Sequence, residues 1–183
     1  MKELSLNILD IVQNSISAKA DTIEILLTET KDKLLTLTIK DNGNGMSKET
    51  LKSVTDPFYT TRKTRKVGMG IPLFKLAAEQ TGGNLTIESV SVEDSPDAHG
   101  TSLTATFRTD SIDFAPLGNI VSTVCVIIQG HPEIDYSFRH VTPSFEVVLN
   151  TKEMREVLGN DISLAEPEIL EWIADNLNQQ YQN

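Results

Sequence analysis

Two side chains near the start of the chain have the types and the spacing needed for metal-assisted chemistry. Asp10 and Asn14 are four residues apart, so on a helix they project from the same side, one above the other. A carboxylate in that position can accept a proton from a water molecule, and an amide oxygen can bind a hard cation such as Mg2+. Taken alone, the pair also fits a solvated helix surface.

A second candidate is the run Asp-Asn-Gly-Asn-Gly at residues 41–45. Apolar residues alternate through the strand expected at 35–39, and this period of two turns Asp41 toward the same core-facing side. A buried carboxylate can accept a hydrogen bond from the exocyclic amine of adenine, whereas the carbonyl of guanine offers no proton there. Gly43 and Gly45 would let a flat base approach the backbone.

The same run does not fit a calcium-binding loop. Such a loop needs glycine at its sixth position, where Met46 stands, and glutamate at its twelfth, where Lys52 stands. A tight turn without a ligand stays an alternative for these residues.

The third candidate is an anion site at Gly68-Met69-Gly70, where a helix is expected to begin. Free backbone N–H groups and the helix dipole favour phosphate at such an N-terminus. Four basic residues lie between positions 62 and 66, directly before it. The spacing matches neither a dinucleotide-binding fingerprint nor a P-loop, and the basic run also fits a soluble loop.

Helical and strand periodicity predicts the elements that position these groups. Residues 2–18 carry an apolar stripe at helical spacing, with Asp10 and Asn14 on the opposite side. The other elements expected are a hairpin over 23–39, a short helix capped by Ser47, a helix over 70–81 closed by Gly82-Gly83, and strands over 84–90 and 101–108.

The composition is that of an ordinary globular protein with an uneven distribution of charge. The chain has 183 residues, 39% hydrophobic and 23% charged, and a net charge of −10. Residues 1–109 hold 14 acidic and 13 basic side chains, whereas residues 110–183 hold 12 and 3. The negative charge argues against nucleic acid and against an anionic membrane surface as partners. No apolar run approaches the ~20 residues of a membrane span.

The number of cysteines and the first residues of the chain both indicate the cellular compartment of the protein. The single cysteine, Cys125, excludes an internal disulfide and a cysteine-based zinc site, and is typical of a reducing compartment. The first residues lack the apolar run of a signal peptide. We therefore expect a cytoplasmic protein.

Residues 110–183 are expected to form a small acidic α+β segment, with a boundary at 110–118 and an unidentified protein as its partner. Residues 120–128 fit a helix, although their β-branched content leaves a buried strand possible. The other elements expected here are strands over 136–141 and 145–149, a short helix capped by Thr151, and a last helix with Pro167 in its first turn.

The order of the motifs resembles that of a known family. The pieces are the acid-x-x-x-Asn helix, the hairpin ending in Asp-x-Gly-x-Gly, Pro-Phe-Tyr-Thr-Thr at 57–61, the basic loop, Gly-x-Gly at a helix start, and Gly100-Thr101 before a strand. From Leu4 to about Arg108 they resemble the Bergerat-fold ATP-binding domain of DNA gyrase, heat-shock chaperones, sensor histidine kinases and mismatch-repair ATPases.

The resemblance implies an α+β fold in two layers, with helices on a mixed sheet and ATP in a cleft beneath a lid. A small α+β appendage would follow at the C-terminal end. The implied division is a histidine-kinase-like ATP-binding domain over 1–109 and the acidic interaction segment over 110–183.

By the same resemblance, ATP and Mg2+ are the expected cofactors. Asn14 would ligate the Mg2+, Asp41 would bind the adenine amine, and Thr101 would help to order Asp41 and a water beside the base. The other nucleotide-binding residues would be Gly43, Gly45 and Met46 after the strand, Thr60, Thr61 and Lys63 in the lid, and Gly68, Met69 and Gly70 at the helix start.

Asp10 stands where ATP-hydrolysing relatives have Glu and where kinases usually have Asn or His, so we expect it to be the catalytic base, with a shorter reach. No helix bears a His-Glu-x-x-Thr-Pro phosphoacceptor motif, and all three histidines are expected to be ordinary surface or core residues. The expected function is ATP hydrolysis or transfer of the γ-phosphate to a partner protein. The alternative is a nucleotide-gated, anti-sigma-like interaction module with little turnover.

Overall fold

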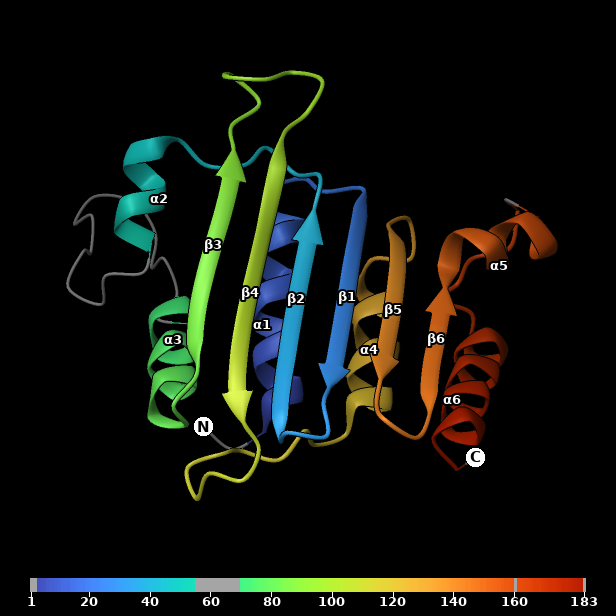
Figure 1. Ribbon diagram of the computed structural model, residues 1–183. Helices are drawn as coiled ribbons and strands as arrows, with labels where there is room; N and C mark the ends of the chain where they lie inside the picture. Colours follow the sequence, from blue (N-terminus) through green and yellow to red (C-terminus); the bar gives the residue numbers. More distant parts are fainter. Residues whose placement is uncertain (1–2, 55–69, 160, 183) are drawn as a thin grey trace.

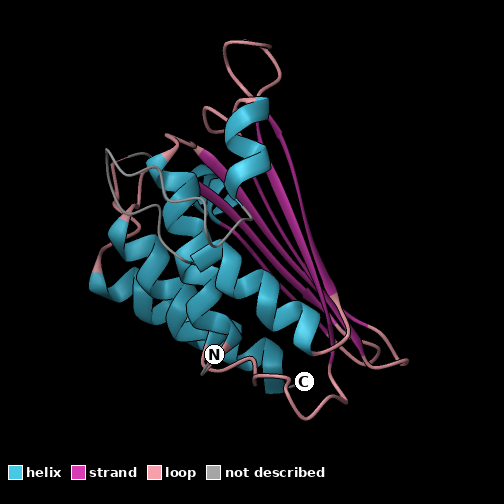
Figure 2. Ribbon diagram, turned by 90° about the vertical axis from the view of Figure 1, so that its left-hand side faces the viewer, coloured by secondary structure: helices cyan, strands magenta, loops and turns pink. Residues whose placement is uncertain are grey.

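The computed structural model describes residues 3–54, 70–159 and 161–182, which form two layers. Figure 2 shows one layer of helices and one sheet, with the helices gathered on a single face of the sheet. The α+β, two-layer fold expected from the sequence is therefore confirmed. Within these described ranges, no helix is long and apolar enough to cross a membrane.

The described helices and strands follow the periodicity of the sequence closely. The helices are α1 (Leu4–Ser17), α2 (Lys48–Val54), α3 (Gly70–Gln80), α4 (Ile120–Gly130), α5 (Thr151–Leu158) and α6 (Pro167–Gln182). The strands are β1 (Thr22–Glu29), β2 (Leu34–Asp41), β3 (Asn84–Val90), β4 (Gly100–Arg108), β5 (Asp135–Val141) and β6 (Glu146–Asn150).

The six strands form one mixed sheet in the order β3-β4-β2-β1-β5-β6. All neighbours are antiparallel except β1 and β5, which run parallel (Figure 1). Alternate residues of β1 and β2 are buried against the helices, as the period of two predicts. The same alternation buries Asp41 at the end of β2, with 8% of its surface exposed.

The segment at 120–128 is a helix, which resolves the choice between helix and buried strand. Its buried residues recur at helical spacing, and the Asn119 side chain accepts a hydrogen bond from the Ser122 N–H at 2.9 Å. This N-cap and the apolar stripe outweigh the weak helix propensity of β-branched residues.

The cap of α5 differs from the expectation. Asn150, not Thr151, is the N-cap, and its side chain accepts bonds from the Lys152 and Glu153 N–H groups. Thr151 is the first residue of the helix and is fully buried. Its hydroxyl accepts the Tyr136 N–H at 2.7 Å, so the side chain is already engaged with β5.

Residues 110–183 fold into helices and strands, as expected, and they continue the same sheet. β5 pairs with β1, and α4 packs against both α1 and α6. The N–H groups of Leu4 and Ser5 donate to the carbonyls of Pro116 and Leu117, each at 2.9 Å. The sheet therefore includes strands from both sides of residue 110. The predicted division into two domains at that point stays a prediction.

His140 on β5 lies in a buried hydrogen-bond network that holds α6 on the sheet. Its Nε2 lies 3.0 Å from a Glu29 carboxylate oxygen, and its Nδ1 lies 2.9 Å from the Tyr181 hydroxyl. Burial and the nearby Glu29 charge raise the pKa of Tyr181 well above its usual value.

Candidate functional site

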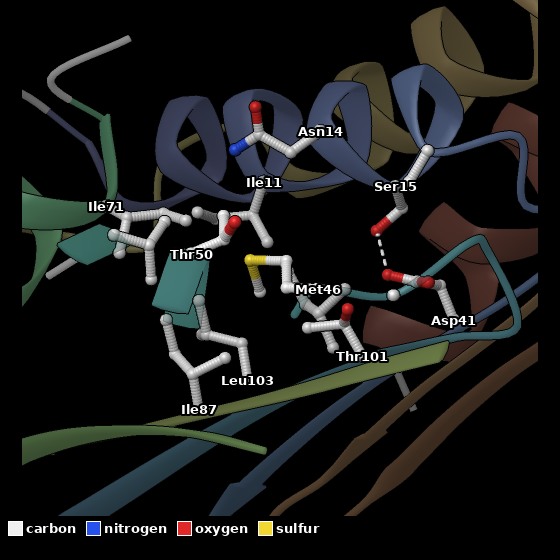
Figure 3. Close-up of a pocket in the computed structure, with 14 residues that line it drawn as sticks. Ile11, Asn14, Ser15, Asp41, Met46, Thr50, Ile71, Ile87, Thr101 and Leu103 are labelled. Atoms are coloured by element: carbon white, nitrogen blue, oxygen red, sulfur yellow. Dashed lines mark hydrogen bonds between the residues drawn. The ribbon is translucent and has the colours of Figure 1, made fainter. Parts of the chain in front are cut away.

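A pocket of about 210 Å3 opens between α1, α2, the start of α3 and the β2–β4–β3 end of the sheet (Figure 3). Its walls are mostly apolar, and Asp41 lies at one end. Its lining residues include Ile11, Asn14, Ser15, Asp41, Gly45, Met46, Ile87, Thr101 and Leu103.

Asp41 is held at this end of the pocket by two donors. The Ser15 hydroxyl donates to Asp41 Oδ2 at 2.6 Å, and the Gly43 N–H donates to Oδ1 at 2.9 Å. Figure 3 shows Ser15 on α1 pointing directly at Asp41. A carboxylate has about four acceptor positions, so these two bonds leave capacity for a donor from a ligand.

The glycines after β2 are required by close backbone contacts. Gly45 has φ +65°, and a Cβ there would lie 1.8 Å from the Val90 carbonyl oxygen. A Cβ on Gly43 would lie 2.8 Å from the Ala18 carbonyl oxygen and 3.0 Å from Asp41 Oδ1. Gly45 lines the pocket, whereas Gly43 is not among the lining residues and contributes its N–H, which bonds to Asp41.

Hydrogen bonds from β3 and from the β3–β4 connection hold this loop in place. On the β3 side, the Ser89 hydroxyl accepts the Met46 N–H at 2.8 Å and lies 2.9 Å from the Thr101 hydroxyl. From the connection between β3 and β4, His99 Nδ1 lies 2.6 Å from the Gly43 carbonyl oxygen. Thr101 is the cross-strand neighbour of Asp41, and its hydroxyl bonds to Ser89.

Asn42 ties the same loop to the start of β1. Its side-chain carbonyl accepts the Thr22 N–H at 3.0 Å, and its amide donates to the Asp21 carboxylate at 2.6 Å. The hydrogen bond from the Asn42 amide is the main reason that the pKa of Asp21 is lowered. Contacts within the protein therefore fix the position of the loop.

Asp10 and Asn14 project from α1 toward solvent, as their spacing predicts. Asn14 lines the pocket, and Figure 3 shows its amide pointing away from Asp41. Asp10 lies beside the first residue of α3, because a Cβ on Gly70 would be 3.9 Å from the Asp10 Cβ. Within residues 3–54, 70–159 and 161–182, no three His, Cys, Asp or Glu side chains are grouped so that they could hold a metal ion.

The structure thus brings most of the expected site residues together. Asn14, Asp41, Gly45, Met46 and Thr101 surround one pocket, with Asp10 and Gly70 adjacent to each other on α1 and α3. The remaining candidates, Thr60, Thr61, Lys63, Gly68 and Met69, lie outside the described residues.

Three polar residues that hold the site together were not expected from the sequence: Ser15, Ser89 and His99. Ser15 had a signal, because it continues the buried stripe of Ile8, Ile11 and Val12 where an apolar residue is normal. A polar residue at such a position needs a buried partner. Ser89 and His99 act through contacts distant in sequence, and no local pattern marks them.

Comparison with known proteins places the chain in a family. Residues 2–111 match the family of histidine kinase-, DNA gyrase B- and HSP90-like ATPases, and the chain belongs to it. The chain therefore carries an ATP-binding domain of the histidine-kinase-like ATPase type, and the predicted family is confirmed.

Two curated relatives come from Bacillus subtilis. Sporulation kinase C is 35% identical over 83 residues, which are 44% of this chain and 19% of the kinase. Sporulation kinase E is 34% identical over 92 residues, which are 49% of this chain and 12% of that kinase. The chain spans less than a fifth of the length of either relative.

Two solved structures share the fold. The Aquifex aeolicus MutL ATPase domain, complexed with ADP, has a TM-score of 0.55 at 13% identity, over 86% of this chain and 69% of its own. The N-terminal domain of a DNA repair protein has a TM-score of 0.54 at 18% identity, over 81% of this chain and 52% of its own.

Replacing Ser15 by Ala is expected to weaken ATP binding and to lower the free energy of unfolding by about 1–3 kcal/mol, because a buried carboxylate loses a donor. Calorimetric titration with ATP and urea unfolding measure the two effects. Ser17→Ala is the matched control, since Ser17 is exposed on the same helix and bonds only to the Gln13 carbonyl among the described contacts. Equal, small effects of both substitutions would contradict the role given to Ser15.

Proposed function

We propose that the pocket binds Mg-ATP, and that the protein hydrolyses ATP or transfers its γ-phosphate to a partner protein in a cytoplasmic compartment. The observation that carries this proposal is the buried Asp41 carboxylate, held by Ser15 and Gly43 at the end of an apolar pocket. The family membership supports ATP as the nucleotide.

Selectivity for adenine follows from the donors and acceptors at Asp41. Its free acceptor positions can bind the exocyclic amine of adenine, whereas the carbonyl of guanine would place an acceptor against an acceptor. Ile11, Met46, Ile87 and Leu103 supply apolar surface for a flat base. A base bound there fills much of the 210 Å3, so the ribose and phosphates would extend toward Asn14 and Gly70.

The phosphates would lie between α1 and α3. At the N-terminus of α3, an 11-residue helix, the helix dipole and the backbone N–H groups of the first turn would favour an anion. Asn14 would hold Mg2+ through its amide oxygen, with phosphate oxygens as further ligands. Bound Mg2+ would neutralise phosphate charge during the reaction.

Asp10 is the proposed general base. Its carboxylate is exposed beside the first residue of α3, where it can accept a proton from a water or from an acceptor hydroxyl. In the transfer reaction the phosphoacceptor would belong to the partner protein, and residues 110–183 would bind that partner.

A nucleotide-gated interaction module is the second candidate, and α1 favours it. This helix carries Ser15 at the nucleotide pocket and packs against α4, while its first N–H groups bond to Pro116 and Leu117. A shift of α1 on nucleotide binding would therefore reach residues 110–183 directly. Turnover would not be needed for such a device.

Replacing Asp41 by Asn should weaken ATP binding by at least about tenfold while changing GTP binding little. The Asn oxygen would stay with the Gly43 N–H, and its NH2 group would then face the adenine amine with a donor. Titration calorimetry with each nucleotide measures this change. Asp32→Asn, at the exposed turn of the same hairpin, is the control. Equal affinity of the wild type for ATP and GTP would refute the proposal that Asp41 binds the adenine amine.

Asn14→Ala should weaken binding of ATP with Mg2+ by about tenfold and leave binding in EDTA nearly unchanged, because only the metal loses a ligand. The two titrations are run on the same preparation. Gln13→Ala, at the exposed neighbouring position, is the control. Equal losses with and without the metal would argue against ligation by Asn14.

Asp10→Asn should bind ATP normally and reduce phosphate release by about 100-fold or more, because the amide cannot accept the proton. A coupled phosphate assay measures turnover. If the wild type shows no turnover, the gated module becomes the better account; if turnover persists in the variant, Asp10 is not the base.

A further inference from the structure

A second hollow lies away from the nucleotide pocket. It is a groove of about 840 Å3 between the β5–β6 edge of the sheet, α5 and α6. The nucleotide pocket lies toward the β3–β4 edge of the sheet and this groove lies at the β6 edge, so the two sites are at opposite ends of the strand order (Figure 1). Nothing in the proposed ATP chemistry uses this groove.

Large apolar side chains at the groove are exposed to an unusual degree. Val157 on α5 is 86% exposed, Trp172 on α6 is 53% exposed, and Val148 on β6 is 49% exposed. Single exposed apolar residues are common, but several lining one hollow mark an interaction site. Trp is also the side chain most often dominant at protein interfaces.

The charged groups around the groove are mainly acidic. Of its ionisable lining residues, Arg139 is paired with Glu146, whereas the described ion pairs include neither Glu153 nor Glu168. Helix α6 carries Glu168, Glu171 and Asp175 and no Lys or Arg. An occupant with basic residues beside its apolar ones would match this surface.

At Val148, the free edge of strand β6 cannot pair with an added β-strand. The Val148 N–H donates to the Gln180 side-chain oxygen at 2.8 Å, and its carbonyl accepts from the Gln180 amide at 3.0 Å. Both backbone groups of this edge residue are therefore already bonded. An occupant would have to bind through its side chains, as a helix does in a groove.

We infer that this groove binds a basic amphipathic helix of a partner protein. A second copy of the chain fits less well, because a two-fold contact would bring the acidic α6 helices together. The inference rests on the proposed partner site in residues 110–183 and is independent of ATP turnover. It specifies the chemistry of the partner as apolar anchors at helical spacing flanked by Lys or Arg.

The test selects occupants from a phage-displayed library of random peptides of about 16 residues, roughly four helical turns. The library is panned on the full chain, with counter-selection on Val157→Ser. Selected peptides are synthesised and titrated while the fluorescence of Trp172, the only tryptophan in the chain, is recorded. Ile112→Ser is the matched control, since Ile112 is 99% exposed and does not line the groove.

The expected result is enrichment of basic amphipathic peptides that shift Trp172 emission to shorter wavelength. They should bind Val157→Ser at least about tenfold more weakly and Ile112→Ser like the wild type, with affinity falling as salt rises. Failure to enrich such peptides, equal binding to Val157→Ser, or self-association that shifts Trp172 would overturn the inference. ATP titration of Val157→Ser should match the wild type, so a failure of ATP binding is detected separately.

Discussion

A carboxylate buried at the end of a core strand needs hydrogen-bond donors, and Asp41 has two. Burial of an unpaired charge would cost several kcal/mol, so the Ser15 hydroxyl and the Gly43 N–H are conditions for this pocket. The bond from Ser15 requires α1 to lie across the end of β2. The bond from the Gly43 N–H holds residue 43 so close to the Ala18 carbonyl oxygen that a side chain would not fit there. The geometry of the pocket follows from these two contacts.

Helix α1 also joins this pocket to the rest of the molecule. The face of α1 that carries Ser15 packs on the sheet, and the helix contacts α4 beyond the family match that ends at residue 111. Its first turn is bonded to the connection between β4 and α4. A nucleotide that alters the position of α1 would therefore act on both parts of the sheet, and the proposed hydrolysis and the proposed gating would share this helix.

Much of this arrangement could be predicted from local patterns. The period of two in β2 placed Asp41 inward, and the helical stripe placed Asp10 and Asn14 on the outer side of α1. The parallel pairing of β5 with β1 could not be predicted, because strands so far apart in sequence leave no local signal of their neighbour. The residue type of Thr151 predicts an N-cap, but Asn150 has the cap position and the Thr151 hydroxyl accepts the Tyr136 N–H instead.

The most direct test of the account compares ATP with purine riboside 5′-triphosphate, which lacks only the exocyclic amine. Titration calorimetry is run with both nucleotides on the wild type and on Asp41→Asn. We expect the wild type to bind ATP at least about tenfold more tightly than the analogue, and the difference to disappear in the variant. Equal binding of both nucleotides by the wild type, or a preference that persists in Asp41→Asn, would contradict the central role of Asp41.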